Sequence, residues 1–426
     1  MGSRTICLLT ICSVAAWGAD TSWMQQYAAE STAANQTCAA KDYAGCRQHL
    51  KLLLQLLDGR ADIVYRLARV DAMLGNRAAA LDGLAIFAKM KLPFADPQTE
   101  PAFADLRATP EFTDILAKLG AARQPVSSSR PFLTLPEKDL VTEDIAYDPS
   151  DDRFYVSSIR HGKILRVARD GPISEFLAEG VPDVWAVLAL GVDAKRRYLW
   201  ATTAAMPENL HFKAEDKGRS ALLRFSLTDG ALLKRYDLPR DTDHALGDLT
   251  LSPAGDVFVS DGHGPVYWVS HDDDRLQPLV PAGKFRSPQT PALSADGRTL
   301  FVPDYSRGIS AVDLKSKRSR LVEHPRELSL GGIDGLYLSG QTMIAVQNGT
   351  SPARIVRMRL DSSLTKIEGF DVLESNSPEL GAPTHGVVVG DRFYFIANSG
   401  WDRLNDDGQV KSGATFESPT IRELKL

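Results

Sequence analysis

The pattern of apolar and polar residues along the chain changes near residue 122. Between residues 19 and 122, alanine and leucine are dense and glycine is scarce, which predicts helices. From Phe132 onward, short stretches of alternating apolar and polar residues are separated by Asp, Gly and Pro, which is typical of strands and tight turns. A polar, proline-flanked segment, residues 123–131, is expected to be a linker. The pattern predicts a multidomain protein with an α-helical region at 19–122 and an all-β region at 132–426.

The helical region contains at least one segment with the spacing of two helices joined by a turn, residues 61–94. This segment resembles a tetratricopeptide repeat in the placement of its small residues and turn glycine: Leu67, Ala68, Gly75, Ala80 and Leu84. One such period earlier, Cys38 ends one helix and Cys46 lies early in the next. A degenerate third unit follows at 103–119. Because such helix pairs usually bind or brace another molecule, a protein partner is expected here.

The all-β region repeats one unit six times: a strand, a tight turn, and a second strand rich in aromatic and branched residues. The units begin 45, 59, 42, 45 and 51 residues apart, at the following positions: Glu143, Leu188, Gly247, Gln289, Asp334 and His385. A period of about 40–50 residues built from strands predicts a six-bladed β-propeller. The segments 131–135 ("PFLTL") and 420–426 ("TIRELKL") are expected to pair and close the ring. A β-sandwich is the alternative, but it does not require six copies of one hairpin.

Length and charge agree with this division. A chain of 426 residues is too long for one ordinary core, and 43% hydrophobic with 24% charged residues is typical of a globular protein. The formal net charge is −5 and no basic patch stands out, so a nucleic-acid partner is not expected.

The N-terminus predicts export. Residues 1–18 combine Arg4, an apolar stretch and small residues before a cleavage point after Gly18, as in a signal peptide. No later run is long enough to span a membrane, so the mature protein is expected to be secreted or periplasmic. Two of the four cysteines leave with this peptide. Cys38 and Cys46 remain, either as a disulfide or as two buried thiols.

The first residue of each repeated unit is the main candidate for chemistry. In a propeller these six positions form a ring at one mouth of the central channel. Glu143, Asp334, His385 and the amide of Gln289 then form a group suited to a hard divalent cation, and the ligand types predict calcium. The alternative is that each polar residue only caps its own strand through a backbone amide.

Loops that follow the second strands return to the same mouth. They contain polar and aromatic residues suited to a substrate rim: His263, Tyr305, Arg307, Asn348, Asn398 and Trp401. The alternative for each of them is an ordinary polar turn.

The propeller region resembles the senescence marker protein/gluconolactonase-like family of six-bladed propellers. The resemblance rests on four stretches: "TEDIAYDP", "GDLTLSPAGDVFVSDG", "SPQTPALSADGRTLFVPD" and "GIDGLYL". It implies a divalent cation in the channel and hydrolysis of lactones. Glu143 matches the glutamate that opens the first blade, and Asp334 matches the aspartate of a later "DG" motif. Gly247, with Asp248 beside it, and Gln289 stand where the family has two asparagine ligands.

Two functions are therefore predicted. The first is an exported, metal-dependent hydrolase that acts on a lactone or sugar derivative. Its cation is held by Glu143, Gln289 and Asp334, and Asp334 or His385 serves as general base. The second is a non-catalytic propeller that binds a ligand or protein, with the helices as a docking region. The missing asparagines favour the second function, and the retained carboxylates favour the first.

Overall fold

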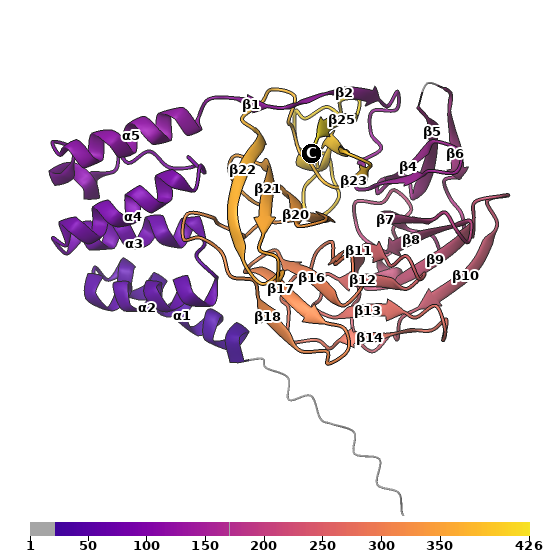
Figure 1. Cartoon of the computed structure of the whole chain (residues 1–426), viewed down its shortest axis with the longest axis horizontal. Coiled ribbons are helices and arrows are strands. Elements are labelled where there is room, and N and C mark those ends of the chain that lie inside the picture. Colours follow the sequence, from indigo (N-terminus) through magenta and orange to yellow (C-terminus); the bar gives the residue numbers. More distant parts are fainter. Residues whose placement is uncertain (1–21, 170) are drawn as a thin grey trace, which may run out of the picture.

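The computed structural model describes residues 22–169 and 171–426, and it has a helical region followed by a six-bladed propeller (Figure 1). The predicted fold class is confirmed. The predicted signal peptide, residues 1–18, lies outside the described residues. Within the described part of the chain, no helix is long and apolar enough to cross a membrane.

The helical region consists of antiparallel helices that each bury one face. Their bounds are α1 (Ser22–Ala39), α2 (Tyr43–Leu56), α3 (Ala61–Met73), α4 (Arg77–Lys89), the short η1 (Pro101–Leu106) and α5 (Pro110–Ala122). Two of the α-helices begin with side-chain caps, since Asp42 accepts from the Gly45 amide and Thr109 from the Phe112 amide. Buried aromatic rings such as Phe87 and Phe103 pack between the helices.

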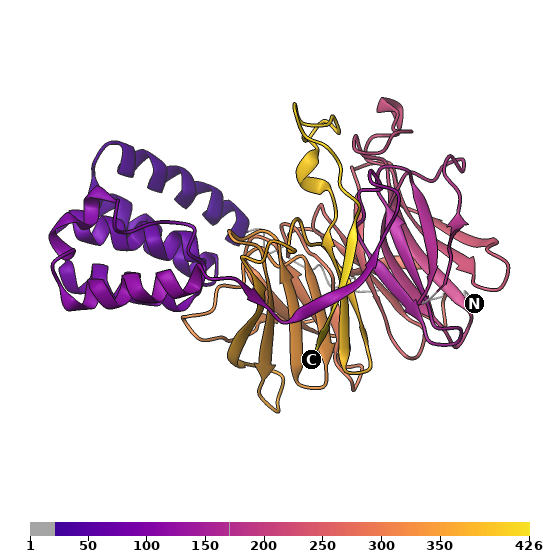
Figure 2. The same ribbon diagram turned by 90° about the horizontal axis from the view of Figure 1, so that it is seen from above.

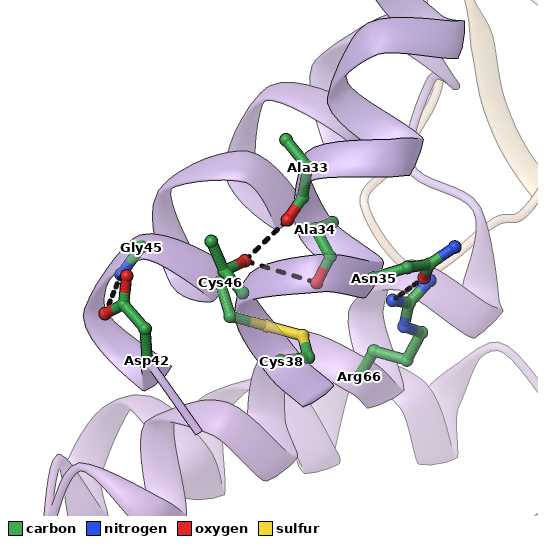
Figure 3. Close-up of a disulfide and its surroundings, with 9 residues drawn as sticks. Ala33, Ala34, Asn35, Cys38, Asp42, Gly45, Cys46 and Arg66 are labelled. Carbon is green, nitrogen blue, oxygen red and sulfur yellow. Dashed lines mark hydrogen bonds between the residues drawn. A yellow bond between two sulfur atoms is a disulfide. The ribbon is translucent and has the colours of Figure 1, made fainter. Parts of the chain in front are cut away.

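A disulfide joins Cys38 and Cys46 across the turn between α1 and α2, with 5.1 Å between their Cα atoms (Figure 3). Cys46 is fully buried among apolar residues of both helices. Thr37 lies beside it and donates its hydroxyl to the carbonyl of Ala33 at 2.7 Å. The disulfide therefore fixes the first helix pair, α1 and α2, at its turn.

Replacing both cysteines with alanine should lower the free energy of unfolding of this region. The bond closes a loop with a sequence separation of 8, for which the loss of chain entropy in the unfolded state corresponds to about 2.5 kcal/mol. Denaturant unfolding of the double variant, against the oxidised parent, measures this difference. Equal stabilities would contradict a structural role for the bond.

The propeller has six antiparallel blades around one axis (Figure 1). Blade 1 contains β3 (Ile145–Asp148), β4 (Arg153–Ser158), β5 (Lys163–Ala168) and β6 (Ile173–Leu177). Blade 2 contains β7 (Ala186–Asp193), β8 (Tyr198–Ala204), β9 (Ser220–Ser226) and β10 (Leu232–Asp237). Blade 3 contains β11 (Leu246–Leu251), β12 (Val257–Asp261), β13 (Val266–Val269) and β14 (Leu276–Val280). Blade 4 contains β15 (Ala292–Leu293), β16 (Thr299–Asp304), β17 (Gly308–Asp313) and β18 (Ser319–Leu321). Blade 5 contains β19 (Gly335–Ser339), β20 (Thr342–Gln347), β21 (Arg354–Leu360) and β22 (Ile367–Ser375).

Blade 6 closes the ring with strands from both ends of the propeller region. It contains β23 (Gly386–Val389), β24 (Arg392–Asn398), β25 (Thr420–Lys425) and, as its outer strand, β2 (Ser129–Thr134). The predicted pairing of the two end segments is confirmed, because β2 runs antiparallel to β25 with Arg130 opposite Glu423. Within the segment predicted as a linker, β1 (Val126–Ser127) adds to the outer edge of blade 5 by pairing with β22.

The helical region lies against the side of blades 4 and 5 (Figure 2). The guanidinium of Arg354, on β21, is completely buried and donates to the carbonyl of Met90, the C-cap of α4, at 2.6 Å. It also donates to the side-chain oxygen of Gln347 at 2.8 Å. Burial lowers the pKa of Arg354 to about 9. The partial negative charge at the end of α4 offsets part of the cost of burying this cation.

A second contact between the two regions contains a titratable pair. His324, in the segment after β18, lies with its Nε2 3.2 Å from a carboxylate oxygen of Asp58, which follows α2. Burial alone would lower the pKa of His324, but the Asp58 carboxylate and the Pro325 carbonyl raise it above its ordinary value of 6.5. The protonated imidazole therefore stabilises the contact.

The melting temperature should fall as the pH rises through the pKa of folded His324. A pKa raised by folding contributes stability that is fully present below the unfolded value, near 6.5, and is lost above the folded value. Melting curves between pH 6 and 9 measure this slope. The variant His324→Gln should lose the part of the slope that depends on this pair, and an unchanged slope would contradict the assignment.

Candidate active site at the channel mouth

Three ionisable residues enter the channel just before an inner strand. Glu143 precedes β3, Asp334 precedes β19 and His385 precedes β23. Blades 1 and 6 are joined at this level, since the amide of His385 donates to the Glu143 carbonyl at 3.2 Å. The Asp334 amide donates to the Val346 carbonyl at 2.9 Å, which fixes the start of β19.

Glycine at 332 allows the loop before Asp334 to take its position. Gly332 has φ +75°, and a Cβ there would meet backbone atoms of Gly349 at 2.7–2.9 Å. Only glycine fits a left-handed conformation with such a close backbone approach. This packing brings the loop that carries Asn348 next to the loop that carries Asp334.

The side chains of Glu143, Asp334 and His385 are buried and converge, with one potential ligand atom of each within 4.8 Å of the others. His385 Nδ1 lies 3.8 Å from Glu143 Oε1, and its Nε2 lies 3.7 Å from Asp334 Oδ1. These are the three ionisable residues of the ring that the sequence predicts, and the fold brings them together.

A fourth ionisable residue, Asp248, belongs to the same group. Its Oδ1 lies 2.9 Å from His385 Nε2 and accepts from the Thr290 hydroxyl at 2.7 Å. The pairing of β11 with β12 shifts register between Leu246 and Asp248, so Gly247 occupies a bulge. The bulge puts the aspartate, one position after the aligned ring residue, against His385. The sequence contains a signal for the position of Asp248. In the first unit, too, the residue one place after the ring position is an aspartate, Asp144.

Burial and neighbouring charges alter the acid–base properties of this group. Burial raises the pKa of Glu143 to about 8, and the charge of Asp334 adds to the shift, while His385 opposes it. Burial likewise raises the pKa of Asp334. Burial alone would lower the pKa of His385, but the carboxylates of Asp334, Asp248 and Glu143 raise it well above its ordinary value. Protons in this group are therefore shared among buried acids and one imidazole.

The group opens into a cavity of about 540 Å³. Glu143, Asp334 and Gln289 contribute to its wall, together with three of the residues predicted for the rim: Tyr305, Asn348 and Trp401. Two further contacts order this wall. The Asn348 amide donates to Asp334 Oδ2 at 2.5 Å, and the Tyr305 hydroxyl donates to the Asn348 side-chain oxygen at 3.1 Å.

Trp401 reaches the site from a long loop between β24 and β25 that contains η3 (Trp401–Arg403). Its indole Nε1 donates to Glu143 Oε2. Gly400, with φ +90°, makes the turn that directs the chain into this short helix. Figure 2 shows this loop and the loop that carries η2 (Ala214–Asp216) projecting from the same side of the propeller.

The other residues predicted for the ring and rim lie elsewhere. The cavity wall does not include His263, Arg307 or Asn398. His263 is exposed, and the Arg307 guanidinium lies over the Trp23 ring of α1 at 4.6 Å. Asn398 ends β24 beside Gly381. Leu188, the ring member from blade 2, is buried in an apolar cluster and provides no ligand.

The residues present fit a divalent cation. Carboxylates of Glu143 and Asp334 face the imidazole of His385, and His385 Nε2 makes no well-aligned hydrogen bond within residues 22–169 and 171–426. Gln289 donates its amide nitrogen to Ser287, which leaves its side-chain oxygen as the available ligand atom. An imidazole within the group favours zinc or manganese relative to the calcium that oxygen ligands alone predict.

No model of a known protein family matches the chain, and no curated protein matches its sequence. Solved structures with a similar fold include a gluconolactonase from Xanthomonas campestris, 16% identical, with a TM-score of 0.47 over 72% of this chain and 92% of that one. Virginiamycin B lyase from Staphylococcus aureus is also 16% identical, with a TM-score of 0.47 over 69% of this chain and 98% of that one.

A third similar structure is U3-55K, which is 10% identical with a TM-score of 0.50 over 71% of this chain and all of that one. At such identities the likeness shows the fold alone. The chain's own sheet topology makes it a β-propeller protein with six blades and an N-terminal helical region.

Proposed function

We propose that the protein is an exported, metal-dependent hydrolase that opens lactones at the channel mouth. The observation that carries the proposal is the convergence of Glu143, Asp334 and His385, the first two of which line a cavity. The resemblance of Glu143 and Asp334 to the ligands of gluconolactonase-like propellers supports the same activity. The disulfide between Cys38 and Cys46 supports export, since such bonds persist in oxidising compartments.

Glu143, Asp334 and the side-chain oxygen of Gln289 would hold the cation, with His385 Nε2 as a further ligand or as the neighbouring base. A bound divalent cation supplies Lewis acidity that polarises the carbonyl of the substrate. The cation would also offset the charge of three buried carboxylates, Glu143, Asp334 and Asp248, the last of which lies 2.9 Å from His385 Nε2.

Proton transfer is assigned to Asp334 or His385. Asp334 lines the cavity and His385 lies directly behind it, so either side chain is a candidate to accept a proton from the attacking water. Asn348 holds Asp334 through the 2.5 Å hydrogen bond, and the Glu143 carbonyl holds His385 by accepting from its Nδ1 at 3.2 Å, so both candidate bases are oriented before substrate binds. This fixed orientation favours catalysis, since a misplaced base loses much of its effect.

Residues of the cavity wall would orient the substrate. The Tyr305 hydroxyl oxygen, whose proton goes to Asn348, offers a hydrogen-bond acceptor to a sugar-like ring, and the Trp401 indole offers an apolar face. Together they suit a small, polar cyclic ester rather than a long apolar one.

The activity is tested on a panel of γ- and δ-lactones of sugar acids, with hydrolysis measured as the acid released at constant pH. Simple aryl esters and lactams serve as comparison substrates. Ring opening of at least one lactone at a rate well above the buffer blank is expected. If every lactone stays intact with calcium, magnesium, manganese or zinc present, the hydrolase proposal fails.

The second candidate function is ligand or protein binding, and two observations favour it. His385 can balance the carboxylates as an imidazolium, so the buried group does not require a cation. A cleft of about 590 Å³ also lies between the helices α2–α4 and blade 4, lined by residues that include Leu54, Leu67 and Val322. Retention of a sugar acid without turnover would support this function.

A further inference from the structure

A second cluster of metal-binding side chains lies away from the channel group. Glu137 and Asp139 come from the connection between β2 and β3, and His161 comes from the loop between β4 and β5. One potential ligand atom of each lies within 4.8 Å of the others. None of the three lines the cavity at the channel mouth.

The imidazole of His161 is oriented as in a metal ligand. Its Nδ1 lies 3.0 Å from a carboxylate oxygen of Glu179. Because an ionised carboxylate only accepts hydrogen bonds, Nδ1 carries a proton, and the coordinating atom of this ring is Nε2. A carboxylate behind a histidine fixes the tautomer and ring orientation in this way at many metal sites.

The Nε2 atom of His161 is buried and has no hydrogen-bond partner among the described residues. His161 is only 9% exposed, and its Nε2 makes no well-aligned hydrogen bond within the described part of the chain. The atom lies 3.2 Å from Asp139 Oδ1 and 3.6 Å from Glu137 Oε1. Two carboxylate oxygens facing Nε2 require a positive charge between them and the nitrogen, which either a metal ion or a proton on Nε2 supplies.

We propose that Glu137, Asp139 and His161 bind a divalent transition-metal ion, zinc in the first place. Ligands about 2.1 Å from a tetrahedral ion lie about 3.4 Å from one another. The two distances from Nε2, 3.2 and 3.6 Å, lie on either side of this value. Water fills the fourth position, and the mixed nitrogen and oxygen ligands favour zinc or manganese over calcium.

The net charge around the cluster is negative and favours a bound cation. Lys163 Nζ contacts Glu137 at 2.7 Å and Glu175 at 3.5 Å, while Arg160 lies 3.5 Å from Asp139. With Glu179, the group has four carboxylates against these two cations, so two negative charges remain when the histidine is neutral. A divalent ion balances that excess.

The site would stabilise the loops around the channel mouth. Glu179, which holds His161, also accepts from Nε2 of His211 at 2.8 Å. His211 belongs to the long insertion between β8 and β9. An ion at His161 therefore connects the segment before β3, the loop after β4 and this insertion, and its role is structural.

The test is the zinc content of the full chain without a histidine tag, after chelation and equilibrium dialysis against zinc. Whatever number of ions the parent holds, His161→Gln should hold one fewer per chain, and Asp139→Asn should bind that ion more weakly. Glu179→Gln should weaken binding about 10- to 100-fold, because the ring loses its partner. The control is His271→Gln, which removes a histidine paired with Asp256 and Asp272 elsewhere and should change nothing.

Circular dichroism of each variant shows whether it is folded. If either His161→Gln or Asp139→Asn fails to fold, the other still tests the site. A parent that binds no zinc would overturn the proposal. So would an equal zinc content in His161→Gln, because the cluster would then be an imidazolium between carboxylates.

Discussion

Replacing Asp334 with asparagine should lower the kcat for lactone opening by about 100-fold or more, while the protein keeps most of its affinity for the cation. The asparagine oxygen can still act as a ligand, but an amide cannot accept the proton of the attacking water. When that oxygen faces the cation, the amide nitrogen takes the place of Oδ2 and the hydrogen bond from the Asn348 amide, 2.5 Å in the parent, is lost. Rates at saturating lactone and calorimetric titration of the cation measure the two effects separately.

His385→Ala distinguishes the two candidate bases. A small change in kcat would leave Asp334 as the base, and a large loss at unchanged cation affinity would assign the role to His385. Asp114→Asn is the matched control, since that aspartate pairs with Lys118 on the surface of α5 and should not affect the rate. Full activity in both Asp334→Asn and His385→Ala would remove the channel group from the mechanism.

Truncation of Arg354 to alanine should cost about 3 kcal/mol or more of unfolding free energy. The completely buried guanidinium donates to Met90 in the helical region and to Gln347 in the propeller, so its loss leaves two buried acceptors without a donor. Each such acceptor costs about 1–3 kcal/mol, and the cavity adds to the loss. Denaturant unfolding gives the difference.

Arg357→Ala, on the same strand, is the control for this prediction. Arg357 is partly exposed and lies 3.3 Å from Asp371, a surface pair of small expected value. Arg354→Lys should fall between the two, because it keeps a charge but not the planar fork of donors. Equal stability of Arg354→Ala and Arg357→Ala would mean that the buried guanidinium does not hold the two regions together.

The sequence predicts the blades well because each hairpin is a local unit. Alternating apolar residues around an Asp, Gly or Pro turn determine a strand pair without long-range information, and six such units imply a ring. The same alignment predicts that Glu143, Asp334 and His385 meet, since each precedes an inner strand. Their distances in the structure follow from that repeated position.

Residues outside the repeated position escape such an alignment. Asp248 enters the site through a bulge at Gly247, and a bulge depends on pairing with β12 that the local pattern does not reveal. Arg354 reads as an ordinary strand residue, because its role arises only where α4 meets β21. The cluster at His161 draws on three separate loops, and loops have no period from which to align them.

The most direct test of the central claim is the rate of lactone opening by one preparation of the parent protein, measured as prepared, after chelation, and after each cation is restored. The account predicts loss of the activity on chelation and its recovery with at least one of zinc, manganese, calcium or magnesium. His161→Gln should show the same dependence, because its ion lies away from the channel. A rate that survives chelation, with less than one ion per chain remaining, would contradict metal-dependent hydrolysis at Glu143, Asp334 and His385.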